Sequence, residues 1–498
     1  MPSASATFPD VVLIGGGVMS ATFAALLKDL SPELSITIFE TLEHGGLESS
    51  KAWNNAGTGH AGNCELNYTP QRPDGSVDIS KALAVNTEFD ISRQLWSHWV
   101  RNGRLADAGS FIHACPHVSL VWGKKDVAFL KARYDAMASH HCFDGMEYSE
   151  DTAVIADWAP LAMEGRDPSV PVAATRIRSG TDVDFGALTR NLFSSLEKET
   201  GFHSFYRHRV TDLVKTTDGR WRVTAVNLQT GARRSVLTRF VFVGAGGAAL
   251  PLLQKSGIPE ARRYAGFPVS GLWLQCTDPA ITQRHHAKVY GKAPVGSPPM
   301  SVPHLDTRVI DGKSCLLFGP YAGFSTKFLK SGSWMDYFRS LNGGNIIPAI
   351  TAAKDNLSLM NYLVREVTQS DHKRFRSLLN FYPRANENQW TKVVAGQRVQ
   401  IIKPDNGGLH GVLRFGTELV RSSDQSLAAV LGASPGASIA ASVALQVVEK
   451  CFPQNVTTSG WLPRLREIFP GYGVDLKTNS ELCRELRRET AQTLQIEN

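Results

Sequence analysis

The first 40 residues combine two patterns of apolar positions. Residues 11–14 are four consecutive apolar residues, which is typical of a parallel strand buried on both faces. Residues 18–30 then place apolar side chains at helical spacing, and residues 35–40 form a second strand-like run. This order of strand, helix and strand predicts a βαβ unit.

Three glycines form the turn between the first strand and the helix. Gly15 permits a tight turn, and Gly17 lets the backbone approach a pyrophosphate group. The helix that follows offers unpaired N–H groups and a favourable dipole to such an anion. Ser20 replaces the third glycine of the usual pattern and is small enough for the helix to pack closely.

Glu40 ends the second strand, 40 − 15 = 25 residues after Gly15. A carboxylate at this distance can accept hydrogen bonds from both hydroxyl groups of a ribose. The same negative charge would repel a 2′-phosphate. The turn, the helix and the terminal acid together predict a dinucleotide-binding fold.

Two distant segments favour FAD over NAD as the dinucleotide. Residues 205–247 predict a three-stranded meander that returns to a buried strand and ends in a glycine turn. Such a meander is the usual companion of an FAD site, whereas an NAD domain does not need it. The expected cofactor contacts from this segment are Val210, Gly244, Ala245 and Gly246.

The second segment, residues 426–452, predicts a strand, a glycine turn and a helix that begins near Ala437. The N-terminus of this helix can face the flavin edge at which negative charge develops on reduction. An ordinary loop before a packing helix is the alternative interpretation. The expected contacts from the turn are Gly432, Ser434, Pro435 and Gly436.

The fold class predicted by these segments is α/β, with a Rossmann-like FAD-binding domain assembled from discontinuous pieces. The chain of 498 residues is long enough for two domains that share a cleft. We expect a mixed α+β substrate domain between the cofactor segments and a separate C-terminal tail. The predicted ranges are 1–80, 176–264 and 396–460 for the FAD domain, 81–175 and 265–395 for the substrate domain, and 461–498 for the tail.

The composition narrows the classes of partner. A formal net charge of +7 could favour an anionic small substrate, an anionic membrane surface or nucleic acid. The basic residues are spread along the chain without a long run, so a solvated basic surface is the simpler interpretation and nucleic-acid binding is not expected. With 42% hydrophobic and 20% charged residues, the chain has the composition of an ordinary globular protein.

The cysteines and the N-terminus indicate a cytoplasmic protein. Seven cysteines are scattered singly with no CxxC pair, which argues against a disulfide framework and a structural zinc site, and no metal is expected. Residues 1–10 have neither a basic nor an apolar signal region, and the apolar runs are interrupted before about 18 residues. Docking on a membrane surface stays open.

Five blocks of the sequence resemble the malate:quinone oxidoreductase family, and the match covers nearly the whole chain. More distantly, His304 with Arg308 and the GQRVQ stretch are similar to FAD-dependent 2-hydroxyglutarate dehydrogenases and to amino-acid-oxidase-like flavoproteins. Gly16, Val18 and residues 62–63 depart from the family pattern beside the cofactor, so fine specificity stays open. The five blocks are residues 48–70, 265–274, 301–313, 316–330 and 395–404.

This resemblance implies FAD, oxidation of L-malate to oxaloacetate, and transfer of electrons to a membrane quinone. It also implies peripheral attachment to the cytoplasmic face of the cell membrane. The same chemistry on L-lactate or 2-hydroxyglutarate is the near alternative. An amino-acid oxidase that uses O2 and a flavin-binding module without turnover are alternatives from other classes.

Oxidation of a 2-hydroxy acid needs a base for the hydroxyl proton. His304 is the leading candidate because a histidine side chain, with a pKa of about 6.5, is largely neutral at physiological pH and can accept a proton. His60 is the second candidate, since it lies in a stretch rich in small residues that is suited to pass close to a flavin. His60 could instead only donate a hydrogen bond. The expected cofactor contacts near this stretch are Ser49, Ser50, Asn55, Gly57 and Thr58.

The two carboxylates of malate need cations. Arg398 is the expected clamp because a guanidinium group binds a carboxylate through two parallel hydrogen bonds and keeps its charge. For the second carboxylate we expect Arg308 ahead of Lys327. A surface salt bridge is the competing interpretation, most of all for Lys327.

The C-terminal tail has a composition compatible with an anchor at the membrane surface. It combines Trp461, Leu465 and Phe469 with several arginines. A solvated capping helix is the alternative and the simpler interpretation. The arginines are Arg464, Arg466, Arg484, Arg487 and Arg488.

Overall fold

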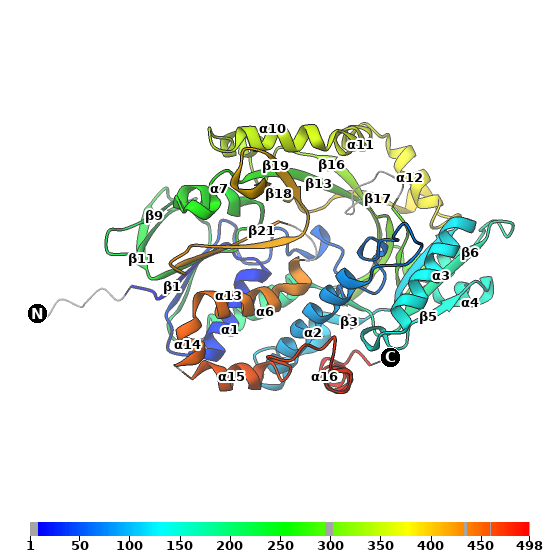
Figure 1. The fold of residues 1–498 in the computed structure, drawn as a ribbon, viewed down its shortest axis with the longest axis horizontal. Helices are drawn as coiled ribbons and strands as arrows, with labels where there is room; N and C mark the ends of the chain where they lie inside the picture. The colour runs from blue at the N-terminus through cyan, green and yellow to red at the C-terminus, as the bar shows by residue number, and fades with distance from the viewer. Residues whose placement is uncertain (1–7, 294–301, 433–435, 459, 498) are drawn as a thin grey trace, which may run out of the picture.

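The structure is a computed structural model that describes residues 8–293, 302–432, 436–458 and 460–497 of the chain. Its centre is a six-stranded sheet in the order β20-β21-β12-β1-β2-β8 (Figure 1). Neighbouring strands from β21 to β8 are parallel, and β20 pairs antiparallel at the edge. The strands are β1 (Val11–Ile14), β2 (Ile36–Phe39), β8 (Phe202–Phe205), β12 (Phe240–Val243), β20 (Thr417–Arg421) and β21 (Leu427–Gly432).

Both faces of this sheet are covered, which explains why its central strands are continuously apolar. All four residues of β1 are buried, as the sequence predicts. One face packs against helices that share a single hydrophobic core, and the other face packs under a three-stranded antiparallel sheet and α7. The elements are α1 (Val18–Leu30), α2 (Ser80–Arg101), α6 (Phe185–Leu196), α7 (Ala249–Ser256), α13 (Ala440–Cys451), β9 (His208–Lys215), β10 (Trp221–Asn227) and β11 (Arg233–Thr238).

A larger, ten-stranded sheet forms the second half of the molecule. Its order is β19-β18-β13-β16-β15-β14-β4-β6-β5, with β17 paired to β13. Most pairs of neighbouring strands in this sheet are antiparallel, so this half is mixed α+β as predicted. The strands are β4 (His117–Trp122), β5 (Glu147–Ser149), β6 (Val172–Ile177), β13 (Ala265–Cys276), β14 (Lys288–Tyr290), β15 (His304–Ile310), β16 (Lys313–Phe324), β17 (Thr391–Val394), β18 (Arg398–Pro404) and β19 (Gly411–Arg414).

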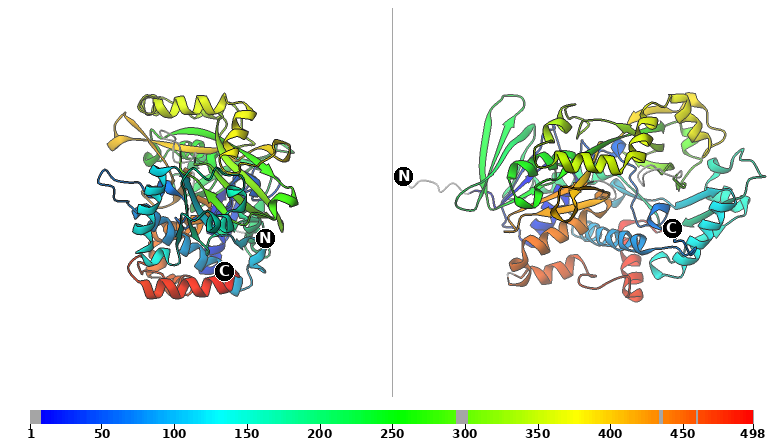
Figure 2. Two further views of the ribbon diagram at one scale, coloured as in Figure 1. Left: turned by 90° about the vertical axis from the view of Figure 1, so that its right-hand side faces the viewer. Right: turned by 45° about the horizontal axis from the view of Figure 1, so that its top comes forward.

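Three short helices cover the outer side of the larger sheet: α9 (Asp336–Ser340), α10 (Ile346–Asp355) and α11 (Leu357–Val367). Two further helices, α15 (Trp461–Ile468) and α16 (Ser480–Leu494), pack against the helices under the six-stranded sheet. Figures 1 and 2 place α10 and α16 on opposite sides of the molecule.

The sheets divide the chain somewhat differently from the predicted ranges. Residues 398–414 were expected in the cofactor domain, but they form β18 and β19 of the larger sheet. Helix α2 was expected in the substrate domain, but it buries Phe89, Trp96 and Trp99 in the core shared with α1. The discontinuous assembly of the cofactor sheet from three separated segments agrees with the expectation.

The C-terminal tail is not an exposed anchor. Trp461, Leu465 and Phe469 have exposed fractions of 3%, 0% and 1% and pack into the core beside α1 and α13. The Arg487 guanidinium bonds to the Asp90 carboxylate of α2 at 2.7 Å. The amphipathic pattern of the tail therefore serves packing within the protein. In the parts of the chain described above, no helix is long and apolar enough to cross a membrane.

The burial of Leu465 makes a stability prediction. We expect Leu465→Ala to cost about 2–5 kcal/mol of unfolding free energy, because it leaves a cavity in a fully buried core. The variant should show a lower Tm and unchanged binding to lipid vesicles. Loss of vesicle binding at an unchanged Tm would instead restore the anchor interpretation.

Candidate functional site

A cavity of about 950 Å³ lies between the two sheets. Its wall includes residues 15–17 after β1, residues 244–247 after β12, and residues 46–50 and 54–58 of the segment that connects the two halves. Residues 396–399 at the start of β18 complete it from the larger sheet. Ligands of open parallel sheets bind outside the carboxyl ends of the strands, and this cavity lies there.

The glycine turn fits a close approach of backbone to a ligand. Gly15 has φ +97°, and a Cβ atom on it would lie 2.7 Å from the Cα of Ala245. Gly17, the N-cap residue of α1, has no side chain to cap the helix, and the helix N-terminus lies on the cavity wall. The backbone N–H of Val18 donates to Ser50 Oγ at 3.0 Å. This cradle suits a pyrophosphate.

Glu40 is held beside the turn by the backbone. Its carboxylate accepts hydrogen bonds from the N–H of Leu42, at 2.7 Å, and from the N–H of Gly16. Burial raises the pKa of Glu40, while the N–H donors act in the opposite direction. The group lines the cavity, where the sequence places a ribose partner.

The structure brings together nearly all of the residues expected at a cofactor. Ser20 is buried behind the turn, and its Oγ lies 2.3 Å from where a Cβ on Gly244 would be. Ser20 therefore keeps the helix close to β12, and does not line the cavity. Ser434 and Pro435 lie outside the described residues. Those that line the cavity are Gly15, Gly17, Glu40, Ser49, Ser50, Asn55, Gly57, Thr58, Val210, Gly244, Ala245, Gly246, Gly432 and Gly436.

Arg398 lies on the wall of the same cavity and has no salt-bridge partner among the described residues. Burial lowers the pKa of its guanidinium group, so an anion beside it would be favoured. Its neighbour Gln397 also lines the cavity, and the buried Oε1 of that side chain accepts no hydrogen bond within the described chain. The sequence missed Gln397.

His304 is placed by its strand and its neighbours. Alternate residues of a strand share a face, so His304 and Asp306 of β15 lie side by side, with Nδ1 of the histidine 2.7 Å from Asp306 Oδ2. The ring stacks on Tyr290 of the adjacent β14 at 4.2 Å and meets the edge of Trp273 at 5.3 Å. The side chain of His304 is 7% exposed and is not among the residues that line the cavity.

His304 and Arg398 nevertheless share one face of the larger sheet. Trp273 contacts His304, and Gly271 lies two residues earlier on the same face of β13. A Cβ on Gly271 would lie 3.7 Å from the guanidinium group of Arg398. Three strand spacings separate β18 from β15, which corresponds to roughly 14 Å.

His60 lines the cavity directly. Burial lowers its pKa to about 3, and the neighbouring His117 and His304 act in the same direction. The ring is therefore neutral at physiological pH. Its conjugate acid would be strongly acidic, which makes His60 a poor acceptor of a proton.

A buried ionic network continues from His304 along the same face of β15. Asp182 is 2.8 Å from Lys288 Nζ and 2.7 Å from Arg308 Nε, and Lys288 lies 3.8 Å from Asp306. All four side chains are fully buried. Burial by itself would lower the pKa of Lys288, but Asp182 and Asp306 hold it above its ordinary value.

Arg308 does not occupy the position expected of a carboxylate clamp. Its guanidinium group donates to Asp182 and to the carbonyl oxygens of Ala52 and Asn55, at 2.8 and 2.6 Å. It lies behind Gly57 and does not line the cavity. Lys327 is also absent from the wall, and its Nζ lies over the Trp334 ring at 5.1 Å.

The sequence contained a signal for part of this network. His304, Asp306 and Arg308 recur at the spacing of two that puts side chains on one face of a strand. Lys288 and Tyr290 pair across strands with Asp306 and His304, a register that no local pattern specifies. Asp182 is 126 residues from Arg308.

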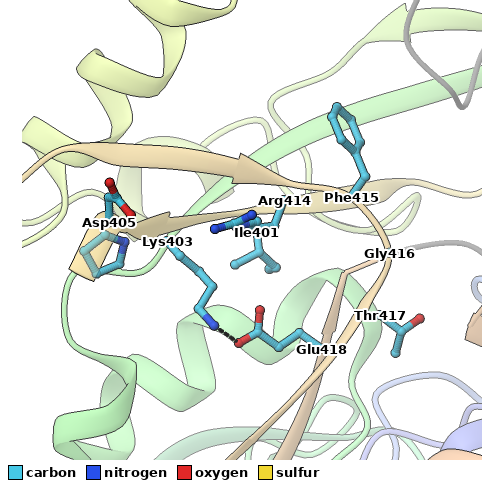
Figure 3. A pocket seen from close by; sticks show the side chains of 9 residues that line it. Ile401, Lys403, Asp405, Arg414, Phe415, Gly416, Thr417 and Glu418 are labelled. Carbon is cyan, nitrogen blue, oxygen red and sulfur yellow. Dashed lines mark hydrogen bonds and ion pairs between the residues drawn. The ribbon is translucent and has the colours of Figure 1, made fainter. Parts of the chain in front are cut away.

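A second cavity of about 430 Å³ lies near the turn between β19 and β20. Its wall includes Arg414, Phe415 and Thr417, and the ion pair of Lys403 with Glu418, at 2.5 Å, satisfies two of its charged groups (Figure 3). It is small and lacks glycines that would bring backbone to a ligand, apart from Gly416. It offers no convergent set of catalytic groups.

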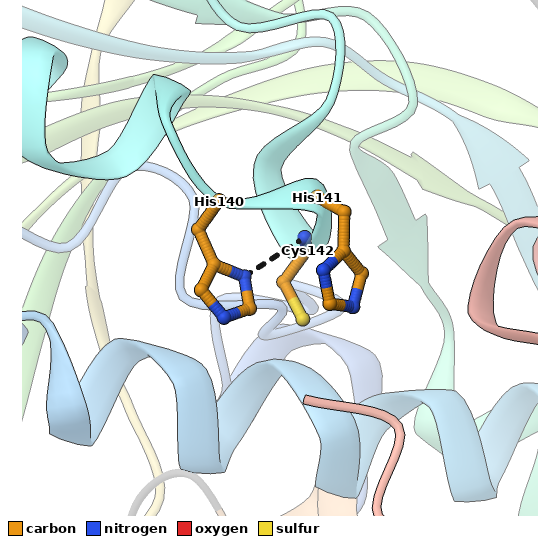
Figure 4. Close-up of side chains that lie close together, drawn as sticks. All are labelled: His140, His141 and Cys142. Carbon is orange, nitrogen blue, oxygen red and sulfur yellow. Dashed lines mark hydrogen bonds between the residues drawn. The ribbon is translucent and has the colours of Figure 1, made fainter. Parts of the chain in front are cut away.

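Among the described residues, one group brings possible metal ligands within 4.8 Å of one another: His140, His141 and Cys142 (Figure 4). His140 Nδ1 accepts a hydrogen bond from the N–H of Cys142, and His141 Nε2 bonds the carbonyl of Leu476. The two rings stack at 4.6 Å and 26°, so their in-plane lone pairs run side by side. The contacts explain the group as local packing.

The fold is that of the FAD-binding oxidoreductases related to amino-acid oxidases. Glycine oxidase from Bacillus cereus superposes with a TM-score of 0.56 at 13% identity, over 90% of this chain and 96% of that one. L-alpha-glycerophosphate oxidase from Mycoplasma pneumoniae, solved with FAD bound, gives 0.54 at 14% identity, over 89% and 94%. These likenesses concern the fold alone.

The sequence places the chain within this class. The family model described as malate:quinone oxidoreductase matches residues 7–496. A "Probable malate:quinone oxidoreductase" of Gluconobacter oxydans is 72% identical over 496 residues, covering 100% of this chain and 99% of the relative. One from Granulibacter bethesdensis is 58% identical over 100% of both chains. The chain belongs to the malate:quinone oxidoreductase family.

The contacts of Arg308 predict a structural role. We expect Arg308→Met to lower the Tm by several degrees, because breaking a buried ionic network costs about 3–5 kcal/mol. Arg308→Lys should recover only part of the loss, since an ammonium group cannot reproduce the fork of donors. A raised KM at an unchanged Tm would contradict this and restore the substrate clamp.

Proposed function

We propose that this protein oxidises L-malate to oxaloacetate with FAD as cofactor and passes the two electrons to a membrane quinone. Membership of the family supports the overall reaction. The observation that supports the site is Arg398 on the wall of a cavity with a dinucleotide cradle. It has no salt-bridge partner among the described residues and lies on the same sheet face as the His304–Asp306 pair.

FAD fits the cavity on structural grounds. The N-terminus of α1 on the cavity wall and the close packing at Gly15 suit a pyrophosphate, and Glu40 suits a ribose. The 46–58 segment and Arg398 lie at the part of the cavity that faces the larger sheet. Bound there, FAD supplies the acceptor for the hydride that leaves the carbinol carbon.

Arg398 binds one carboxylate of malate through two parallel N–H donors, which fixes the orientation of the carbinol. Arg308 is saturated by the protein, so the second carboxylate does not depend on it. Gln397 is the neighbouring polar side chain on the wall, and its amide provides N–H donors for that group. Because Arg398 is charged and Gln397 is neutral, the two side chains would distinguish the two carboxylates of the substrate.

His304 takes the hydroxyl proton at Nε2, because its Nδ1 faces Asp306. The carboxylate stabilises the positive charge that the ring gains. Burial by itself would raise the pKa of Asp306, but His304 and Lys288 hold it below its ordinary value. Asp306 is therefore charged at physiological pH, and we assign it a positioning role. His60, neutral on the cavity wall, serves as a hydrogen-bonding partner.

The electron acceptor places the protein at a membrane surface. A quinone with a long apolar tail resides in the bilayer, and no described helix spans one. We propose that the protein is cytoplasmic and binds the inner face of the cell membrane peripherally. No role for nucleic acid is proposed.

Anaerobic reduction tests cofactor, activity and substrate together. Purified protein should be yellow, and adding L-malate without O2 should bleach the flavin absorbance. Arg398→Ala should keep its flavin but raise KM by about 10²-fold, since a charged hydrogen bond in a buried site contributes roughly 1.5–3 kcal/mol. L-lactate, 2-hydroxyglutarate and amino acids are the comparison substrates. A yellow protein that stays oxidised with malate would refute the proposal.

The assignment of the base has its own test. His304→Gln should lower kcat by about 10²- to 10⁴-fold with flavin retained, because general-base catalysis is typically worth that much. Asp306→Asn should lower kcat more than it changes KM, as expected of a positioning residue.

His60→Gln is the matched control for this assignment. His60 has a pKa of about 3, so it stays neutral between pH 5 and 8, and its loss should leave the acid limb of the kcat–pH profile unchanged. An acid limb that disappears in His60→Gln and persists in His304→Gln would reverse the two roles.

A further inference from the structure

Exposed apolar side chains gather on one surface of the larger domain. Of the 18 large hydrophobic residues that are exposed in the described chain, nine lie between Trp334 and Val367. The most exposed have fractions of 48–62%. We call these six residues the docking face: Trp334, Met335, Phe338, Ile350, Leu357 and Val364.

The docking face is not simply the inner side of poorly packed helices. Helix α10 buries Ala349 and Ala352 against the larger sheet, and α11 buries Leu359 and Leu363 against β16. These helices therefore carry a second apolar stripe that points away from the protein. They form the outermost layer at the top of Figure 1. Apolar side chains exposed together on an outer layer mark a protein or membrane contact.

Charges around the docking face favour an anionic partner. Arg339, Lys354 and Arg365 are exposed, and none of them forms a salt bridge with another described residue. Each acidic group of these helices has a partner within the protein: Asp336 accepts from the N–H of Ser333 at 2.9 Å, Asp355 pairs with His410 at 2.7 Å, and Glu366 accepts from the amide of Gln369 at 2.6 Å. Free cations among apolar side chains match the headgroup layer of an anionic bilayer.

The docking face adjoins the cavity. Residues 331–333, with Asp336, Arg339 and Ser340 of α9, form part of the cavity wall, while Phe338 of the same helix points outward. One short helix therefore separates the apolar surface from the space that would hold the cofactor. An acceptor dissolved in hydrocarbon would reach the cavity beside this helix without crossing water.

The C-terminal helices α15 and α16 cannot contact the same bilayer as the docking face. Figure 2 shows α16 on the side opposite α10, so a flat bilayer cannot contact both. Trp461, Leu465 and Ile468 of α15 are buried, whereas the residues of the docking face are exposed.

We propose that the docking face lies on an anionic lipid bilayer, with Arg339, Lys354 and Arg365 at the headgroups, and that quinone enters the cavity beside α9. This inference rests on the proposed function for the identity of the acceptor. The binding of lipid by this surface does not depend on it. A second copy of this chain is the competing occupant.

Vesicle flotation tests the lipid contact. Full-length protein should bind vesicles of phosphatidylcholine with 30% phosphatidylglycerol, chosen as the anionic probe, at least tenfold more tightly than phosphatidylcholine alone. Ile350→Glu with Leu357→Glu should reduce this binding at least tenfold at an unchanged Tm. Val154→Glu places the same charge on an exposed apolar residue of α4 (Thr152–Trp158) and should bind as the wild type does. Wild-type binding by the double variant would overturn the proposal.

The charges are tested separately. Lys354→Glu with Arg365→Glu should lose most of the preference for anionic vesicles and keep any binding to neutral ones. Equal binding of the wild type to both kinds of vesicle would overturn the charge assignment. Light scattering after gel filtration tests for the competing occupant. If the wild type is a dimer and the variant with Ile350→Glu and Leu357→Glu is a monomer, the face belongs to a contact with a second copy.

Turnover separates this inference from the proposed function. With a water-soluble dye as acceptor, the variant with Ile350→Glu and Leu357→Glu should oxidise malate at the wild-type rate. With a long-chain quinone in vesicles, its rate should fall at least tenfold. Failure of the wild type to reduce the dye with malate would refute the proposed function and leave the vesicle result standing. An equal rate with vesicle-bound quinone would overturn the entry route.

Discussion

The buried ion pairs of Asp182 with Lys288 and Arg308 are the constraint on which the rest of the site depends. They join three parts of the chain: Asp182 comes from β7 (Thr181–Val183), whereas its two partners come from adjacent strands of the larger sheet. Arg308 also bonds the backbone carbonyls of Ala52 and Asn55, in the segment that passes along the cavity. The network thus fixes the connection between the two halves. Charges buried this deeply persist only when they are paired.

The same network explains why His304 has a defined orientation. Lys288 holds Asp306 from one side, and Asp306 faces His304 from the other, while Tyr290 stacks on the ring. A histidine that is fixed in this manner would present one nitrogen to the substrate of the reaction that we propose. The guanidinium of Arg398, on a strand three positions away in the sheet, has no salt-bridge partner in the described parts of the chain and complements it with a positive charge. The substrate position that we propose follows from this division of the sheet face.

The arrangement of surfaces agrees with a reaction that begins in water and ends in lipid. The charged groups that would bind malate lie inside, between the sheets, whereas the apolar helices lie outside and beside the cavity wall. A soluble dicarboxylate and a membrane quinone need different surroundings, and in our proposal one cavity beside an exposed apolar surface would serve both. The tail, whose pattern resembles an anchor, instead closes the core beneath the cofactor sheet.

The sequence by itself determined the parts of the protein that depend on local order. The apolar run before Gly15, the helix after it and the acid at Glu40 are neighbours in the chain, so their pattern specified the cradle, and three glycine turns specified the discontinuous domain. Only the tertiary structure decided which side a stripe of apolar residues faces, and which charges meet. An apolar stripe of a helix has the same pattern whether it faces a core, as in α15, or points outward, as the second stripe of α11 does. As an arginine, Arg308 could bind a carboxylate of a ligand, but in the structure it binds Asp182, which lies 126 residues away in the chain. Pairs of buried charges form in three dimensions and leave no periodic pattern in the sequence.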